Sequence, residues 1–120
     1  MKRILIIDDD QKLLDIMRRW LEGLGYDVIE ALNGRIAIDL QRRTPADLII
    51  TDIFMPEKEG LELIMELQQE FPQCKIIVIT GGGSVDGVDF LRLTENLGAH
   101  RTFLKPFTKN ELLRAIRELL

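Results

Sequence analysis

The chain has 120 residues with 16 lysines and arginines against 20 aspartates and glutamates, so its formal net charge is −4. This length suits one domain whose core needs no disulfide or structural metal, and the negative charge argues against nucleic acid as its direct partner. The single cysteine, Cys74, cannot form an internal disulfide, and no apolar stretch reaches the ~20 residues that span a bilayer, so we expect a soluble, cytoplasmic protein without a membrane contact.

Apolar, strand-like runs alternate with helix-like stretches along the whole chain. The predicted strands cover residues 4–7, 26–30, 47–51, 76–79 and 102–104. The predicted helices run from the Asp10 cap to Gly23, from Asn33 to about residue 43, from the loop at residues 55–60 to Phe71, from residue 84 to Leu97, and from about Thr108 onward. No linker, repeat or low-complexity tract interrupts them, so we expect residues 1–120 to form a single domain.

The predicted strands are apolar on both faces, which is typical of a parallel sheet covered by helices on both sides. Right-handed crossovers then predict a doubly wound α/β fold, a flavodoxin-like (βα)5 sandwich of three layers. The common order for five such strands is 2-1-3-4-5. Ligands bind such sheets beyond the carboxyl ends of the strands where the winding reverses, here between the first and third strands.

Polar residues stand at the carboxyl ends of the predicted strands. Asp8 and Asp9 follow the first strand, Asp52 the third, Thr80 the fourth and Lys105 the fifth. Three converging carboxylates repel one another unless some are protonated or a cation binds them. Hard oxygen ligands with open coordination positions suit Mg²⁺, or Mn²⁺ in its place, so the pattern predicts a divalent cation site.

The same strand ends predict phosphoryl chemistry. A divalent cation, the ammonium of Lys105 and the hydroxyl of Thr80 around one carboxylate form a clamp for a doubly charged phosphoryl group. We therefore expect Asp52 to act as a nucleophile that forms an aspartyl phosphate.

These residues also carry a family resemblance. Asp8-Asp9, Asp52 with Met55-Pro56 and Gly60, Thr80, and Lys105-Pro106-Phe107 closely resemble the motifs of the receiver domain of two-component response regulators, over essentially the whole chain. The resemblance implies that Asp52 accepts a phosphoryl group from a phosphohistidine on a sensor histidine kinase or a histidine phosphotransfer protein. It implies a signalling switch that catalyses only its own phosphorylation and dephosphorylation, and that acts on a downstream effector protein or an output domain.

The resemblance also implies how a metal ion is held. Asp9, Asp52 and the backbone carbonyl of Phe54 would ligate Mg²⁺. Asp8 would act mostly through a bound water molecule.

A second group of residues is implied around the phosphate. Lys105 would pair with the phosphoryl oxygens, and Thr80 would turn its hydroxyl onto them and draw its loop inward. Backbone N–H groups of Ile53 and Gly81 would complete the cradle. The peptide bond before Pro106 would be cis, as it is in the family.

The chain departs from the family pattern at the output switch. Receivers usually carry Tyr or Phe three residues before the lysine, and that ring reports phosphorylation to the face formed by the fourth helix, fifth strand and fifth helix. Here Thr102 takes that position, and Phe103 should point to the opposite side of its strand. We therefore expect the signal to pass through the Thr80 loop and the fourth helix.

The stretch between the fourth and fifth strands is longer than the common pattern. Its glycines at residues 81–83 predict a mobile loop. In the helix behind this loop the apolar residues form two flanks, Val88 with Leu91 and Phe90 with Leu93 and Leu97. Either both flanks share one broad buried stripe, or one flank is exposed to a partner or to a second copy of the chain.

Two positions shape the access of water to the acyl phosphate in receivers. They lie two residues beyond the phosphorylated aspartate and the threonine, and here they are Phe54 and Gly82. A bulky Phe54 would shield the phosphate, and Gly82 offers no side chain to orient water, so we expect slow self-dephosphorylation.

Two other function classes stay open. An aspartate-nucleophile phosphatase usually needs a second acid two residues after the nucleophile, and Phe54 stands there, which argues against that class. A phosphorylation-independent interaction module would not need the complete set of acids, threonine and lysine. The sequence also leaves open whether the chain works as a stand-alone receiver or as a domain of a longer regulator.

Overall fold

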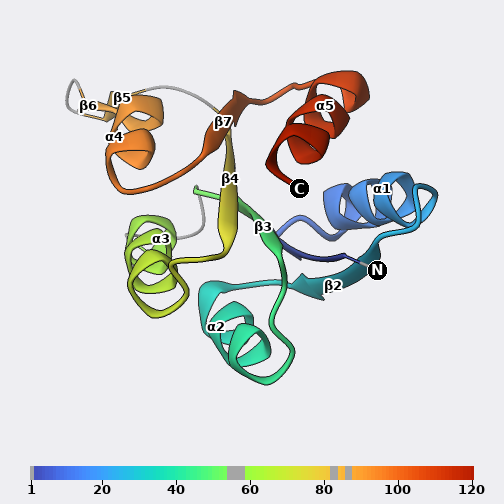
Figure 1. The fold of residues 1–120 in the computed structure, drawn as a ribbon. Coiled ribbons are helices and arrows are strands. Elements are labelled where there is room, and N and C mark those ends of the chain that lie inside the picture. The colour runs from blue at the N-terminus through green and yellow to red at the C-terminus, as the bar shows by residue number, and fades with distance from the viewer. Residues whose placement is uncertain (1, 54–58, 82–83, 86–87) are drawn as a thin grey trace.

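The computed structural model describes residues 2–53, 59–81, 84–85 and 88–120 of the 120-residue chain. Five parallel strands form one sheet in the order β2-β1-β3-β4-β7, with helices between them (Figure 1). The strands are β1 (Arg3–Ile7), β2 (Asp27–Ala31), β3 (Leu48–Asp52), β4 (Lys75–Thr80) and β7 (Arg101–Leu104), and the helices are α1 (Gln11–Glu22), α2 (Gly34–Arg43), α3 (Glu59–Glu70), α4 (Phe90–Asn96) and α5 (Lys109–Leu119). The predicted doubly wound fold, with strand order 2-1-3-4-5 in this sheet, is confirmed.

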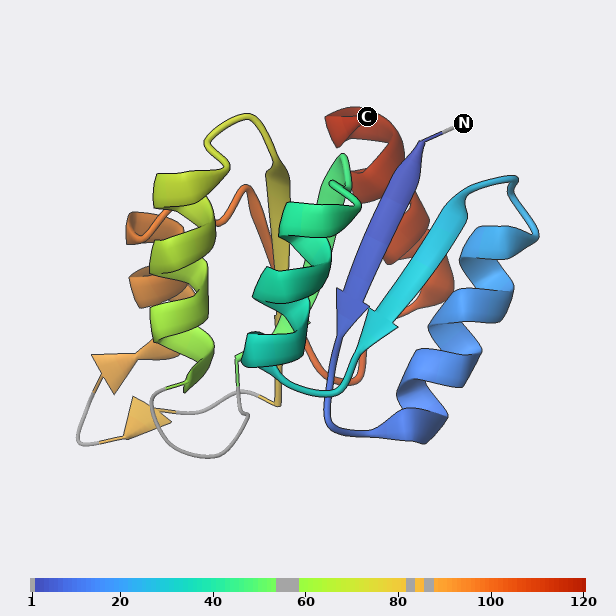
Figure 2. The ribbon, with the colours of Figure 1, turned by 90° about the horizontal axis from the view of Figure 1, so that it is seen from below.

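The central strands are buried on both faces because helices cover the sheet from both sides. Figures 1 and 2 show α1 and α5 on one side of the sheet and α2, α3 and α4 on the other. Along β1, Ile4 and Ile6 pack into the core shared with α1 and α5, whereas Leu5 and Ile7 pack into the core shared with α2 and α3. Because successive side chains of a strand point to opposite faces, β1 contributes residues to both cores.

Side-chain caps begin three of the helices at the predicted positions. The carboxylate of Asp10 accepts hydrogen bonds from the N–H groups of Lys12 and Leu13, at 3.0 and 3.4 Å. Asn33 and Thr108 cap α2 and α5 in the same way. Such a cap satisfies N–H groups that have no partner within the helix. Helix α1 thereby begins immediately after the acidic end of β1.

The stretch after β4 differs from the predicted helix beginning at residue 84. Two short strands, β5 (Ser84–Val85) and β6 (Val88–Asp89), pair antiparallel, and α4 begins only after them. The two residues between these strands read Asp-Gly in the sequence, which is a strong hairpin signal. This local turn preference outweighs the helical spacing of the apolar residues around it.

The other predictions for this stretch concern mostly residues outside the described part of the chain. Of the mobile loop predicted at residues 81–83 only Gly81 is described, and residues 82–83 and the side chains of Val88, Phe90, Leu91 and Leu93 lie outside the described part. The side chain of Leu97 is described, and it packs half-buried against the core shared with α3.

Within the described ranges, no helix is long and apolar enough to cross a bilayer.

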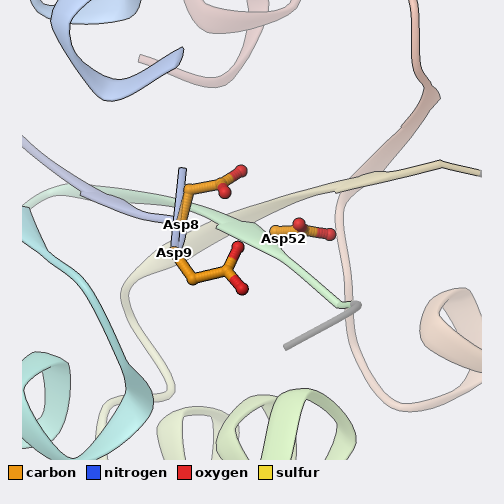
Figure 3. Close-up of side chains that lie close together, drawn as sticks. All are labelled: Asp8, Asp9 and Asp52. Atoms are coloured by element: carbon orange, nitrogen blue, oxygen red, sulfur yellow. The ribbon is translucent and has the colours of Figure 1, made fainter. Parts of the chain in front are cut away.

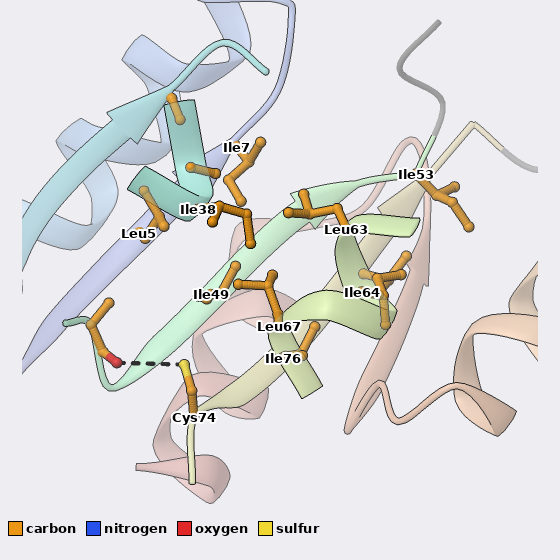
Figure 4. Packing of buried hydrophobic residues seen from close by; sticks show 14 residues of the cluster. Leu5, Ile7, Ile38, Ile49, Ile53, Leu63, Ile64, Leu67, Cys74 and Ile76 are labelled. Carbon is orange, nitrogen blue, oxygen red and sulfur yellow. Dashed lines mark hydrogen bonds between the residues drawn. The ribbon is translucent and has the colours of Figure 1, made fainter. Parts of the chain in front are cut away.

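Cys74 belongs to the core between the sheet and α3 (Figure 4). Its thiol donates a hydrogen bond to the carbonyl of Ala46 at 3.4 Å. Burial, together with the negative charge of Asp47, raises the pKa of this thiol from 9.0 to about 12.

We expect Cys74 to be almost unreactive in the folded protein. At neutral pH a pKa of about 12 leaves a thiolate fraction about a thousandfold smaller than that of an unperturbed cysteine. Alkylation by iodoacetamide, followed by mass spectrometry, should label the thiol in urea and hardly at all in native buffer. Rapid labelling in native buffer would show that the thiol is accessible.

His100 lies just before β7 and makes two hydrogen bonds to the backbone of Ile76 in β4. Its own N–H donates to the carbonyl of Ile76 at 2.8 Å, and its Nδ1 accepts the N–H of Ile76 at 3.1 Å. Burial, and then the positive charges of Lys75 and Arg101, lower the pKa of His100 below its ordinary 6.5.

We expect His100 to destabilise the fold in mildly acidic solution. Because its pKa is lower in the folded state, the unfolded chain binds the proton more tightly, and stability falls as the pH drops below about 6.5. The His100→Asn variant keeps an acceptor near the position of Nδ1 but does not titrate. Urea denaturation at neutral and mildly acidic pH should show a smaller loss of unfolding free energy in this variant. Equal losses would assign the pH dependence to other groups.

Candidate functional site

Three carboxylates meet at the carboxyl edge of the sheet, because β1 and β3 are neighbours. Ile7 pairs with Thr51 in the parallel ladder, which sets Asp8 and Asp52 side by side at the strand ends. Both are buried, with 2% and 5% of their surface exposed, whereas Asp9 is exposed. Figure 3 shows Asp8, Asp9 and Asp52 gathered at this edge, and each offers a carboxylate oxygen within 4.8 Å of the others.

Lys105 brings a positive charge to two of these acids. Its ammonium Nζ donates to Oδ2 of Asp52 at 3.1 Å and to Oδ2 of Asp8 at 3.2 Å. Its backbone N–H donates to the carbonyl of Thr80 at 2.7 Å, which ties the end of β7 to the end of β4. The peptide bond between Lys105 and Pro106 is cis.

The charges at this edge are only partly balanced. Burial raises the pKa of Asp8, and the nearby charge of Asp52 adds to the rise, while the N–H of Asp10 and the ammonium of Lys105 oppose it. Burial by itself would lower the pKa of Lys105, but the hydrogen bonds and charges of Asp52 and Asp8 outweigh it and raise that pKa. Lys105 therefore stays protonated, and its single positive charge pairs with two of the three clustered acids.

The three acids fit a small divalent cation. Mg²⁺ binds oxygen ligands at about 2.1 Å in octahedral geometry, which places neighbouring ligand oxygens about 3 Å apart and opposite ones about 4 Å apart. The oxygens of Asp8, Asp9 and Asp52 lie within 4.8 Å of one another, which is only slightly more than the separation of opposite ligands around one ion. A cation would also remove the repulsion between Asp8 and Asp52.

The hydroxyl and backbone positions predicted around the phosphate lie at the same edge. Thr80 is buried at the end of β4, and Gly81 follows it as an exposed residue. The N–H of Ile53 donates to the carbonyl of Ile79 at 3.3 Å, a long bond. If the N–H of Ile53 bound a phosphoryl oxygen, it would lose this hydrogen bond to Ile79.

Four predicted positions cannot be placed. The backbone carbonyl of Phe54, the Met55-Pro56 pair and Gly82 lie outside the described residues. The proposed third protein ligand of the metal and the proposed control of water access therefore remain predictions.

One contact at the site escaped the sequence analysis. The backbone N–H of Asp10 donates to Oδ1 of Asp8 at 2.8 Å and so fixes the orientation of that carboxylate. Asp10 was predicted only as the cap of α1. An aspartate two residues before a helix cap is a signal for such a turn, since Asp side chains often bond to the backbone N–H two residues on.

Thr102 and Phe103 point to opposite sides of β7, as predicted. Thr102 Oγ1 lies 3.2 Å from Oε1 of Glu95 in α4, within hydrogen-bond distance. Phe103 packs against the core formed with α1 and α5 and lies 6.5 Å from the ring of Phe107. The usual aromatic position thus holds a polar contact between β7 and α4.

Comparison with known proteins points to one family. The response regulator receiver domain matches residues 4–117 of the chain. The transcriptional regulatory protein CpxR of Escherichia coli is 37% identical over 121 residues, covering all of this chain and 50% of CpxR. The response regulator MprA of Mycolicibacterium vanbaalenii is 36% identical over 122 residues, covering 98% of this chain and 50% of MprA. The chain therefore spans about half the length of these relatives.

Solved structures agree with this match. A CheY-like response regulator receiver domain protein from Methanospirillum hungatei superposes with a TM-score of 0.90 at 33% identity, covering 98% of this chain and 92% of that one. The response regulator TrrA of Thermotoga maritima, solved in complex with Mg²⁺ and BeF, gives a TM-score of 0.85 at 31% identity and covers both chains fully.

We expect removal of one carboxylate to stabilise the metal-free protein. Asp8→Asn keeps the Oδ1 acceptor for the Asp10 N–H but removes a buried negative charge. Burial and the charge of Asp52 both raise the pKa of the Asp8 carboxyl group. Urea denaturation in EDTA should therefore give a higher free energy of unfolding for the variant than for the wild type. Added Mg²⁺ should stabilise the wild type by about 2.7 kcal/mol at a hundred times the dissociation constant, and the variant by less at the same concentration.

Asp10→Asn serves as the matched control, because asparagine caps helices as well as aspartate and residue 10 is not among the three clustered acids. It should respond to Mg²⁺ as the wild type does. A destabilised Asp8→Asn protein in EDTA would mean that the pairing with Lys105 outweighs the repulsion among the acids.

Proposed function

The chain belongs to the family of response regulator receiver domains, and from this we propose that it is a phosphorylation-controlled switch whose phosphoacceptor is Asp52. The observation that carries the proposal is the setting of this buried carboxylate, which lies beside Asp8 and Asp9 and accepts a hydrogen bond from Lys105 at 3.1 Å. A nucleophile, a cation site and a fixed positive charge are the parts that phosphoryl transfer to a carboxylate needs.

The proposed reaction is an in-line displacement at phosphorus. A carboxylate oxygen of Asp52 forms a bond to the phosphorus of a donor phosphohistidine, the phosphorus–nitrogen bond breaks, and the imidazole leaves with the electron pair and takes up a proton. Lys105 already donates to one oxygen of Asp52, and it would pass to a phosphoryl oxygen as negative charge moves there. Thr80, at the end of the adjacent strand β4, would donate its hydroxyl to another phosphoryl oxygen.

Asp8, Asp9 and Asp52 would hold the Mg²⁺ ion, or Mn²⁺ in its place, with the carbonyl of Phe54 as a further ligand. When bound, the ion would neutralise the acids and the incoming phosphoryl oxygens. The solved complex of TrrA with Mg²⁺ and BeF supports this assignment at 31% identity. The backbone N–H groups of Ile53 and Gly81 would complete the phosphate cradle.

The proposed partners follow from the family. The phosphoryl donor would be a sensor histidine kinase or a histidine phosphotransfer protein in the cytoplasm. The receiver of the signal would be an effector protein or an output domain, since CpxR and MprA are about twice as long as this chain and are named a transcriptional regulatory protein and a response regulator. Homodimer formation is a further proposal for the same output step.

The proposed output path runs through α4 and the face that α4 forms with β7 and α5. Thr80, next to Gly81, would draw the following loop toward the phosphate. The contact between Thr102 and Glu95 joins β7 to α4 where receivers usually place an aromatic ring. Phe103 faces the other core, so it takes no part in this path. The chain would thus act as a switch that turns over no metabolite, rather than as a phosphatase.

The decisive experiment is incubation with Mg²⁺ and acetyl phosphate, followed by intact-protein mass spectrometry. The wild type should gain the mass of one phosphoryl group, and Asp52→Asn should gain none, because an amide oxygen is too weak a nucleophile. The adduct should be released by hydroxylamine, which cleaves acyl phosphates.

Asp15→Asn is the control, since this carboxylate on α1 is exposed and accepts a hydrogen bond from Gln11. It should be phosphorylated like the wild type. A folded wild type that binds Mg²⁺ but gains no mass, or an Asp52→Asn protein that gains it, would contradict the proposal.

A further inference from the structure

Three aromatic rings form a chain of contacts on the α1 and α5 side of the sheet. Trp20 of α1 meets Phe107 edge to face, with ring centroids 6.4 Å apart and an interplanar angle of 86°. Phe107 in turn lies 6.5 Å from Phe103 of β7, at an angle of 43°. All three pack half-buried against the core that α1 and α5 share. The edge-to-face geometry is a favourable arrangement for two rings.

Phe107 is the second residue after Lys105, so this contact anchors the segment that carries the ammonium. Two contacts hold this segment in place. At its start the N–H of Lys105 donates to the carbonyl of Thr80 at 2.7 Å, and at its end the ring of Phe107 is held by Trp20 and Phe103. The lysine side chain leaves between the anchors and reaches Asp8 and Asp52.

The contact between Trp20 and Phe107 also links α1 back to the site. Asp8 precedes the cap of α1 at Asp10, and α1 carries Trp20 ten residues further along the chain. Trp20 contacts Phe107, and Lys105 returns to Asp8 at 3.2 Å. The helix that begins at the acids therefore also holds the segment that delivers the opposing charge.

We propose that Trp20 is a positioning residue for phosphoryl transfer, and that it acts through Phe107 to hold Lys105 over Asp52. This inference rests on the proposed function of Asp52 as the phosphoacceptor. A lysine side chain has four rotatable bonds, and its charge lowers a barrier only when it is already aimed at the place where charge develops. A misplacement of about 1 Å can reduce a rate a hundredfold, so the anchor of the Lys105 segment bears directly on the reaction.

The first test compares phosphorylation rates with acetyl phosphate at saturating Mg²⁺. Trp20→Leu removes the ring and should slow phosphorylation about tenfold. Its Mg²⁺ affinity should stay unchanged, because Asp8 and Asp9 follow β1 and Asp52 ends β3. Trp20→Phe restores a ring and should react nearly as the wild type does. Ile16→Ala is the matched control on the same helix, because Ile16 is an exposed apolar residue, and the rate of this variant should be unchanged.

A double-mutant cycle separates positioning from a general loss of structure. In a Lys105→Ala background Trp20→Leu should have no further effect on the rate, because the residue through which it acts is gone. A merely structural tryptophan would slow both backgrounds by the same factor, and that result would overturn the inference. If Trp20→Leu does not fold, Phe107→Leu takes its place in the cycle with the same expectation.

The single tryptophan supplies a direct signal. Its emission should change when beryllofluoride and Mg²⁺ bind the wild type, because the Lys105 segment adjusts to the bound anion, and Phe107→Leu should remove most of that change. An equal change in Phe107→Leu, or an undiminished rate in Trp20→Leu, would overturn the role of Trp20 alone. A wild type that is not phosphorylated at all would instead overturn the proposed function.

Discussion

The ammonium of Lys105 lies between the buried carboxylates of Asp52 and Asp8, and the rest of the site depends on this charge balance. Removing an isolated carboxylate from water is costly, so two buried acids persist only with compensating charge or hydrogen bonds. Lys105 and the N–H of Asp10 supply part of that compensation. The remaining negative charge, increased by Asp9, gives a divalent cation and then a phosphoryl group a favourable place to bind.

The parallel sheet makes this balance possible. The central strands β1, β3 and β4 are buried on both faces, so their side chains are mostly apolar until the strand ends. All five strands of the main sheet run in the same direction, and their carboxyl ends therefore form one polar edge. The order places β1 and β3 side by side, and β7 next to β4, so acids, hydroxyl and ammonium gather from segments as far as 97 residues apart in the chain.

The output side of the molecule is built differently from the phosphate side. At the edge of the sheet, β7 contacts α4 through a polar pair, Thr102 and Glu95. Its other face contributes Phe103 to an aromatic cluster that holds the Lys105 segment against α1. The two faces of β7 thus make different kinds of contact, polar toward α4 and aromatic toward α1 and α5. Breaking a polar contact that can be replaced by water costs less free energy than exposing a buried aromatic ring. The α4 side of β7 is therefore better suited to movement.

The sequence by itself determined the alternation of strands and helices, because burial imposes periods of 2 and 3.6 on apolar residues. It also determined the acids, Thr80 and Lys105 at the strand ends, since a polar residue after a buried run stands out. It did not predict the hairpin before α4, where an Asp-Gly pair competed with helical spacing. Only the tertiary structure decided that Asp10 orients Asp8, that Glu95 meets Thr102, and that Trp20 holds Phe107. A periodic pattern reports which face of an element is buried, but the identity of the side chain it meets depends on how elements distant in the chain pack together.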